Sequence, residues 1–212
     1  GWKSVTGTTR YDCSWVLLVD NLLDLTHTTF VHKSTIGTDD VANTPVTSYR
    51  EGNIVTINRM MKDTKPSNLY KRIGDFKGKI DRWQKIWLDP PSTVIIEAGG
   101  VPAGTQNKSN GIDTRVISIL KPVDERTVDQ VWAFARNTYL DDIELDADIE
   151  QSIIHTFNED IDFLAGQQLN IEKHPDKSMQ NNAADAGVIH ARRIIDELLA
   201  AEASATDVAL SK

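Results

Sequence analysis

Residues 14–32 read SWVLLVDNLLDLTHTTFVH, and their apolar side chains are too dense and too continuous for a strand at the protein surface. The pattern predicts one mostly buried helix over Ser14–Val31. The groups that interrupt it are Asn21, Asp24, His27 and His32. The first three follow one another at intervals of three residues, so on a helix their side chains lie along one side and point to a common place. His32 follows after a slight change of direction.

Buried imidazole, carboxylate and amide groups need partners, because each unsatisfied group costs on the order of 2 kcal/mol or more. A bound metal ion would offset that cost. Two histidines and one carboxylate, with coordination positions left open, form the facial triad of non-haem Fe(II) oxygenases. The residues alone leave alternatives open, because zinc accepts similar ligands and because a single inward histidine is more often a hydrogen-bonded core residue than a ligand.

The carboxylate of such a triad has to come from elsewhere in the chain. Downstream of Asp146, isoleucine, phenylalanine and leucine recur at helical spacing and predict a second helix. Asp160 falls on its apolar stripe, whereas Glu159 and Asp162 fall on the polar side. We therefore predict that Asp160 faces inward, as a metal ligand or in a hydrogen bond between helices. We assign no role to the remaining histidines, which lie in polar or irregular contexts: His155, His174 and His190.

The middle of the chain predicts an antiparallel sheet of roughly six strands. The β-prone runs are Val46–Tyr49, Ile54–Ile57, Ile80–Leu88, Thr93–Ala98, Thr114–Leu120 and Thr127–Ala135. Glu51–Asn53 and Asp89–Ser92 have the composition of hairpin turns, while Lys33–Thr47 and Gly99–Gly111 have that of loops. A further helix is predicted around Val188–Leu199. The order of elements describes an α+β domain whose helices lie on one face of a curved sheet, with a small-molecule pocket between sheet and helix.

Composition narrows the class of protein. The 212 residues suffice for one domain, and a formal charge of −8 argues against nucleic acid or an anionic membrane surface as a partner. Cys13 is the single cysteine, which excludes an internal disulfide and any Cys-rich zinc or iron-sulfur site built from this chain. No apolar run reaches the length of a membrane span, so we expect a cytoplasmic protein. Because the chain begins with Gly1 rather than Met, we expect the native polypeptide to extend further towards its N-terminus.

Three groups of residues together resemble the α subunits of Rieske-type non-haem iron oxygenases, in particular the vanillate O-demethylase-like branch. They are Asn21–His27 with His32, the stretch Asp81–Gln84 before Pro90-Pro91, and Glu159-Asp160. The resemblance covers essentially the whole chain. It implies a START-like helix-grip fold, in which a curved antiparallel sheet packs on a long C-terminal helix. It also implies that His27, His32 and Asp160 bind one Fe(II), that Asp24 bridges a ligand histidine to the Rieske cluster of a neighbouring subunit, and that Asn21 lies beside the iron.

The implied reaction is the dioxygen-dependent hydroxylation or O-demethylation of a small aromatic substrate, in a homotrimeric parent enzyme supplied with electrons by an NAD(P)H-dependent reductase or ferredoxin. The family's Rieske half needs two Cys and two His for its [2Fe-2S] cluster, and this sequence offers only Cys13. Residues 1–212 are therefore either the catalytic domain of a longer chain, which the missing N-terminal Met favours, or a divergent protein that works without the cluster. We expect the catalytic domain alone to be inactive with a reductase. Two other classes remain in competition: a metal-free START-like module that binds a small apolar ligand, and a zinc hydrolase, which would need a general base beside the metal.

Overall fold

The computed structural model describes residues 1–32, 35–37, 39–105 and 111–210. Its centre is a seven-stranded antiparallel sheet in the order β1-β7-β6-β5-β4-β3-β2. The strands are β1 (Lys3–Tyr11), β2 (Thr47–Glu51), β3 (Ile54–Thr64), β4 (Ile80–Asp89), β5 (Thr93–Pro102), β6 (Ile112–Asp124) and β7 (Thr127–Arg136). The helices are α1 (Trp15–Leu23), α2 (Thr28–Val31), α3 (Asp39–Asn43), α4 (Asn68–Ile73), α5 (Ile143–Lys173) and α6 (Ala186–Leu210), with a short 3-10 helix at Ala183–Asp185.

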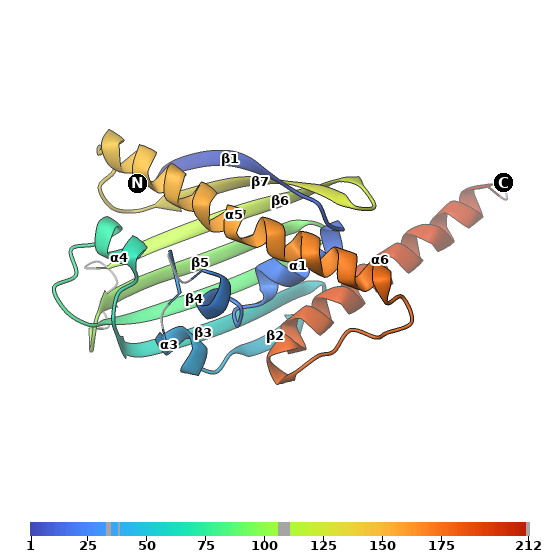
Figure 1. The fold of residues 1–212 in the computed structure, drawn as a ribbon, viewed down its shortest axis with the longest axis horizontal. Coiled ribbons are helices and arrows are strands. Elements are labelled where there is room, and N and C mark those ends of the chain that lie inside the picture. The colour runs from blue at the N-terminus through green and yellow to red at the C-terminus, as the bar shows by residue number, and fades with distance from the viewer. Residues whose placement is uncertain (33–34, 38, 106–110, 211–212) are drawn as a thin grey trace.

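The long helices cover one face of the sheet, as Figure 1 shows. Helix α5 crosses the sheet and contacts β1, α6 contacts β2 and β3, and α1 lies between them over the central strands. Alternate residues of each strand point towards these helices, which is the periodicity of a sheet with one buried face. The core between the two layers includes Leu18, Ile57, Leu120, Trp132, Phe134, Ile153, Phe157 and Ile194. The predicted α+β architecture, with helices on one face of an antiparallel sheet, is confirmed.

The predicted count of six strands is wrong, because β1 also belongs to the sheet. Its sequence, KSVTGTTRY, contains only two large apolar residues, Val5 and Tyr11, so its alternation is weak. The strand forms through pairing with β7 at the sheet edge. Its Gly7 lies under Trp132, where a Cβ atom would come within 2.3 Å of the indole ring.

The prediction of one helix over Ser14–Val31 is also wrong. Helix α1 starts at its N-cap Ser14 and stops at Leu23, because Asp24 has extended backbone angles of φ −82° and ψ 113°. The Asp24 carboxylate accepts hydrogen bonds from the backbone N–H groups of Thr26 and His27, at 2.6 and 3.3 Å. Such local bonds compete with continuation of a helix, and the chain turns here before α2 begins.

The two predicted loops are shorter than expected. Strand β5 continues to Pro102 and so includes Gly99, where a Cβ would lie 2.1 Å from the Trp83 ring. Residues 106–110 of the predicted Gly99–Gly111 loop, and residues 33–34 and 38 of the predicted Lys33–Thr47 loop, lie outside the described residues. Helices α3 and α4 occupy parts of the chain for which no helix was predicted. None of the helices in the described ranges has both the length and the apolar character that crossing a membrane requires.

Candidate metal centre

The side chains of three residues converge where α1, α2 and α5 meet: His27, His32 and Asp160. His27 is the N-cap of α2 and His32 its C-cap, so the four residues of α2 set the spacing between the two imidazoles. Asp160 comes from the buried face of α5. Each residue offers one ligand atom, and these atoms all lie within 4.8 Å of one another. The structure thus brings together the three predicted ligands.

The separations between these atoms suit a single small ion. The Nε2 atoms of His27 and His32 are 3.1 Å apart, and Asp160 Oδ1 lies 3.9 and 3.5 Å from them, respectively. Two nitrogens at about 2.1 Å from one ion, subtending roughly a right angle, are separated by about 3 Å. Asp160 Oδ1 is buried and has no hydrogen-bond partner among the described residues. An unpaired buried carboxylate oxygen facing two imidazole nitrogens is the environment that a divalent cation would complete.

A carboxylate lies behind each histidine. His32 Nδ1 is 2.9 Å from Glu159 Oε2, and His27 Nδ1 is 3.5 Å from Asp24 Oδ2. Thr35 Oγ1 donates a further hydrogen bond to the same Glu159 oxygen at 3.1 Å. The acceptor at His32 Nδ1 holds the proton on that nitrogen and leaves Nε2 as the ligand atom, which is the usual arrangement around metal-bound histidine. His27 Nδ1 lies within ion-pair distance of Asp24 but has no hydrogen-bond partner among the described residues.

Asp24 is held by the turn that ends α1. Thr26 donates both its backbone N–H and its hydroxyl to Asp24 Oδ1, each at 2.6 Å. Burial opposes ionisation of this carboxyl, but interactions with His27 and Thr26 outweigh burial and lower its pKa below the ordinary value. Asp24 is therefore an anion at neutral pH, and about a quarter of its side chain is exposed (26%).

Asp160 has the opposite electrostatics. Burial raises its pKa, and the two histidines and the nearby Asn21 side chain offset part of that rise. The predicted proximity of Asn21 to the cluster is therefore present, although Asn21 and His27 do not share one helix as the sequence analysis assumed.

The cluster opens into a cavity of about 90 Å³ between α1, α5 and the inner face of the sheet. Its walls are mostly apolar, formed by Leu22, Leu25, Ile36, Ile86, Ile96 and Phe157, with the polar groups of the cluster at one side. Gln84 of β4 also lines it. An apolar lining with a few convergent polar groups is typical of a small-molecule site, but such sites usually enclose roughly 300–1,000 Å³, and this cavity is smaller.

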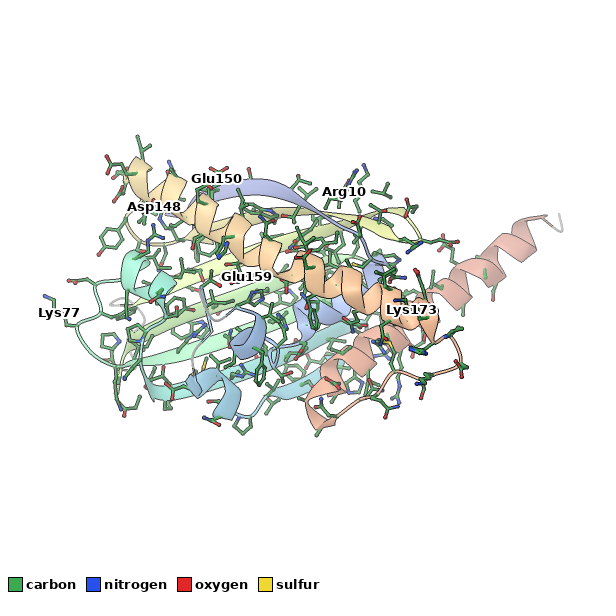
Figure 2. The ribbon with its side chains drawn as sticks, in the orientation of Figure 1. Arg10, Lys77, Asp148, Glu150, Glu159 and Lys173 are labelled. Atoms are coloured by element: carbon green, nitrogen blue, oxygen red, sulfur yellow. The ribbon has the colours of Figure 1, made fainter. Side chains whose placement is uncertain are left out.

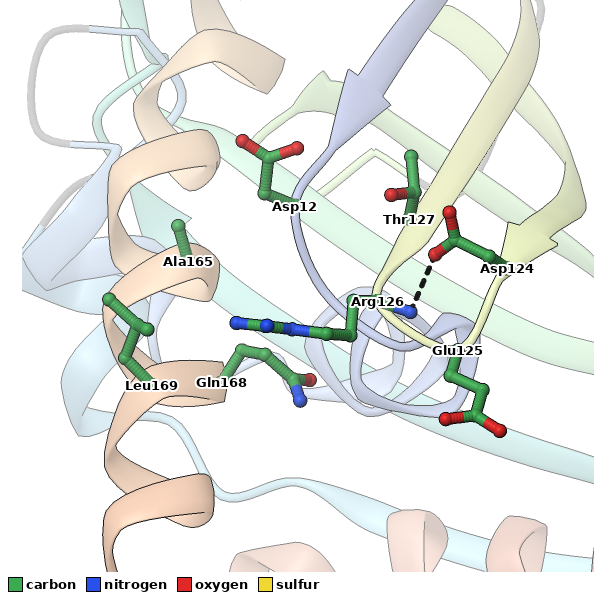
Figure 3. Close-up of a pocket in the computed structure, with 8 residues that line it drawn as sticks. All are labelled: Asp12, Asp124, Glu125, Arg126, Thr127, Ala165, Gln168 and Leu169. Carbon is green, nitrogen blue, oxygen red and sulfur yellow. Dashed lines mark hydrogen bonds between the residues drawn. The ribbon is translucent and has the colours of Figure 1, made fainter.

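A larger and more open pocket of about 680 Å³ lies between the β6–β7 turn and α5 (Figure 3). Six of the eight residues that line it are polar or charged, and the other two are Ala165 and Leu169: Asp12, Asp124, Glu125, Arg126, Thr127, Ala165, Gln168 and Leu169. Arg126 already pairs with Glu172 at 2.9 Å. The lining includes none of the residues of the metal cluster. The volume of a pocket therefore does not identify the candidate metal centre in this protein.

Sequence reasoning missed Glu159, which was placed on the polar side of its helix. Glu159 lies midway along α5 (Figure 2), and its side chain is only 16% exposed. Neighbouring helical residues point about 100° apart, so a residue directly before an inward Asp160 can reach the edge of the same site. Of the histidines given no role, His155 is 61% exposed and lies 3.8 Å from the other Glu159 oxygen, and His174 is exposed at the end of α5.

Comparison with known proteins gives a consistent family match. Residues 11–201 match the Vanillate O-demethylase oxygenase C-terminal domain family. The chain is 35% identical over 213 residues to a putative toluene-4-sulfonate monooxygenase system iron-sulfur subunit of Comamonas testosteroni, an alignment covering 97% of this chain and 62% of that protein. It is 33% identical over 221 residues to a vanillate O-demethylase oxygenase subunit of a Pseudomonas species, covering 99% and 62%.

Among solved structures, a crystal structure of dicamba monooxygenase bound to 3,6-dichlorosalicylic acid superposes with a TM-score of 0.88. The identity is 23%, and the alignment covers 95% of this chain and 60% of that one, so the likeness establishes the fold. The predicted curved sheet packed on a long helix is thereby confirmed. The chain spans about three fifths of the length of the curated relatives it matches.

Proposed function

This chain belongs to the family of vanillate O-demethylase oxygenase C-terminal domains, and on that premise we propose that it is the catalytic domain of a Rieske-type monooxygenase that hydroxylates or O-demethylates an aromatic substrate. The observation that carries the proposal is the convergence of His27, His32 and Asp160 beside an apolar cavity. These residues would hold one Fe(II), as two histidines and a carboxylate do in non-haem iron oxygenases.

Bound iron would supply dioxygen activation, with two electrons and two protons delivered so that one oxygen atom enters a substrate C–H bond and the other leaves as water. The chain's own residues hold and orient the ligands. Glu159 accepts from His32 Nδ1 and fixes its tautomer, Asp24 places a negative charge beside His27 Nδ1, and Asn21 favours the ionised form of Asp160. Asp24 is ionised, partly exposed and 3.5 Å from His27, and these properties suit a residue that would link a ligand histidine to an electron donor on a neighbouring subunit.

The apolar walls position the substrate. Leu22, Ile86 and Phe157 would keep water from the metal-facing side and pack against an aromatic ring, for which the cavity of about 90 Å³ would have to widen. For an aryl methyl ether, hydroxylation of the methyl carbon gives a hemiacetal, which breaks its C–O bond to release formaldehyde and a phenol. Relatives named for vanillate and for toluene-4-sulfonate act on substituted aromatic rings, and we propose a substrate of that size here.

The remaining components belong to the parent system. Relatives carry names such as iron-sulfur subunit and oxygenase component, which fits our proposal of a [2Fe-2S] domain and an NAD(P)H-dependent reductase or ferredoxin. We propose that residues 1–212 form the mononuclear-iron domain alone. A homotrimer would bring the cluster of one subunit to Asp24 of the next.

Hydrogen peroxide allows the chemistry to be tested without an electron donor, because it already carries the two electrons and two protons. The Fe(II)-loaded chain would be mixed with peroxide and a panel of methoxybenzoates, and formaldehyde and phenol would be quantified. We expect equal amounts of both products from at least one substrate, and none above background from Asp160→Ala or from the zinc-loaded chain. If the iron-loaded wild type gives no more formaldehyde and phenol than the background with every substrate of the panel, the oxygenase proposal is contradicted.

A further inference from the structure

Two buried arginines lie on the inner face of the sheet next to the metal cavity. Arg59 of β3 is 3% exposed and Arg82 of β4 is 2% exposed. Arg59 pairs in register with Gln84, and Arg82 lies two residues before Gln84 on the same face of β4. Gln84 lines the cavity beside His27, His32 and Asp160, whereas neither arginine is part of that lining. The arginines therefore lie directly behind a residue of the cavity wall.

These guanidinium groups lack the partners that buried cations normally have. Arg59 Nε and Nη1, Arg82 Nε and Gln84 Oε1 are buried without a hydrogen-bond partner among the described residues. Arg82 makes one long hydrogen bond, from Nη1 to the carbonyl oxygen of Ile36 at 3.4 Å, and lies 4.8 Å from the centroid of the Tyr70 ring. Within the described ranges, neither arginine forms an ion pair with a carboxylate.

The two charges also oppose each other. Burial first, and then the nearby Arg82, lower the pKa of Arg59 to about 10, and Asp24 offsets only part of that effect. A buried charge without a counter-ion is strongly destabilising, and two neighbouring ones are more so. A fold that keeps them needs a compensating anion, and the cavity bordered by Gln84 is the place where a ligand would bring one.

We propose that Arg59 and Arg82, with Gln84 between them and the metal, form an anion subsite for the carboxylate or sulfonate of an aromatic ligand. The ring lies against the apolar walls of the cavity, and the anionic end faces the guanidinium groups. Guanidinium matches such groups well, since its forked N–H donors bind two oxygens at once. The inference deepens the proposed function, because the same cavity is taken to hold the oxygenase substrate.

Binding measurements with matched probes test the subsite directly. Isothermal titration calorimetry would compare 4-methoxybenzoate, 4-methoxybenzenesulfonate and the neutral isostere 4-methoxybenzamide, using wild type, Arg59→Met and Arg82→Met. For wild type, we expect at least one anion to bind about tenfold more tightly than the amide, or better. In each variant, the Kd of that anion should rise about tenfold or more, while the Kd of the amide should stay the same. The preferred anion separates carboxylate from sulfonate recognition.

Control variants separate this role from a structural one. Arg50→Met removes an arginine that pairs with Glu197 on the surface, and it should leave all three affinities unchanged. Because Arg59 lacks partners at Nε and Nη1, Arg59→Met should not lower the melting temperature. If the Met variants do not fold, Arg59→Lys and Arg82→Lys replace them in the test. Weaker binding of the anion with unchanged binding of the amide would support the subsite. Unchanged binding of the anion would overturn it.

Two results overturn the subsite. One is equal binding of amide and both anions by wild type, and the other is full anion affinity in both folded Met variants. The iron content of the same samples, measured by elemental analysis after incubation with Fe(II), distinguishes a failure of the subsite from a failure of the proposed function. Iron binding without anion preference contradicts the subsite alone, whereas anion preference without iron binding contradicts the iron oxygenase proposal alone.

Discussion

Glu159 Oε2 lies 2.9 Å from His32 Nδ1, so the residue directly before Asp160 positions a histidine that Asp160 also faces. One turn of α5 thus contributes both a candidate ligand and the carboxylate that orients another. With Nδ1 engaged, His32 presents Nε2 to the cluster, 3.1 Å from His27 Nε2. The local geometry of the proposed iron site therefore depends on Glu159 as well as on its three ligands.

Replacing Glu159 should weaken metal binding without unfolding the chain. Glu159→Ala removes the acceptor that fixes the His32 tautomer, and outer contacts of this kind commonly change metal affinity about 10–100-fold. Glu159→Gln keeps an acceptor oxygen and should lose less. Competition for Fe(II) with a chelator of known affinity measures both. Asp162→Ala, an exposed acid on the same helix, is the matched control, and a Glu159→Ala affinity equal to that of this control would refute the positioning role.

Asp160→Asn should stabilise the metal-free chain. The buried Asp160 Oδ1 has no hydrogen-bond partner in the described structure, and burial raises the pKa of the carboxyl, so the charged form is disfavoured. Removing the charge while keeping the shape should raise the melting temperature by about 2–4 °C for each kcal/mol recovered. Fe(II) should raise the melting temperature of wild type but not of Asp160→Asn. A metal-free variant that melts below wild type would show that the carboxylate is satisfied without metal.

Asp24→Asn should separate iron binding from electron transfer in a full-length parent enzyme. The amide keeps the size of the side chain and can still accept from Thr26, but it loses the negative charge beside His27. We expect iron content near that of wild type and a large loss of reductase-driven product formation. Turnover equal to wild type would remove Asp24 from the proposed bridge to the neighbouring cluster.

Asp81 should stabilise the fold in a pH-dependent way. Its carboxylate accepts hydrogen bonds from the backbone N–H of Asp63 and from the Lys62 amine, at 3.0 and 2.9 Å, and these contacts lower its pKa. They hold the irregular end of β3, where Asp63 has a positive φ of 54°. We expect Asp81→Asn to lower the free energy of unfolding at pH 7 by about 1–3 kcal/mol.

The sign of the pH effect follows from the lowered pKa. The contribution of ionised Asp81 is present above the ordinary carboxyl pKa of about 4 and is lost as pH falls through the lower value of the folded state. Urea unfolding of wild type and Asp81→Asn should therefore give a difference at pH 7 that shrinks towards pH 2. A difference that stays constant over this range would contradict the assignment.

The fold was more predictable than the local path of the chain through the site. The alternation of apolar and polar residues in β3 to β7 predicted the sheet, and the apolar stripe of α5 predicted the helix that covers it. Both patterns arise because a strand or helix at the core buries one face. Strand β1 was missed since pairing with β7, rather than its own apolar pattern, makes it a strand. The convergence of Asn21, Asp24 and His27 was anticipated for a wrong reason, because a turn held by Asp24, and not helical spacing, brings them together.

The parts of the site that escaped prediction depend on contacts between distant segments. Glu159 meets His32 across 127 positions of sequence, which no local pattern reveals. Arg59 and Arg82 look like ordinary polar residues of strands, yet both are buried, and Arg82 contacts Ile36 and Tyr70 from other parts of the chain. Asp160 was accessible to sequence reasoning because it interrupts an apolar stripe.

The iron content of the chain tests the central claim most directly. Wild type and His32→Ala would be incubated anaerobically with Fe(II), desalted and measured by elemental analysis, with His174→Ala as a control far along α5. We predict one iron per chain in wild type and in His174→Ala, and essentially none in His32→Ala with its circular dichroism spectrum unchanged. No iron in wild type, or equal iron in wild type and His32→Ala, would contradict the iron site and favour a metal-free binding module.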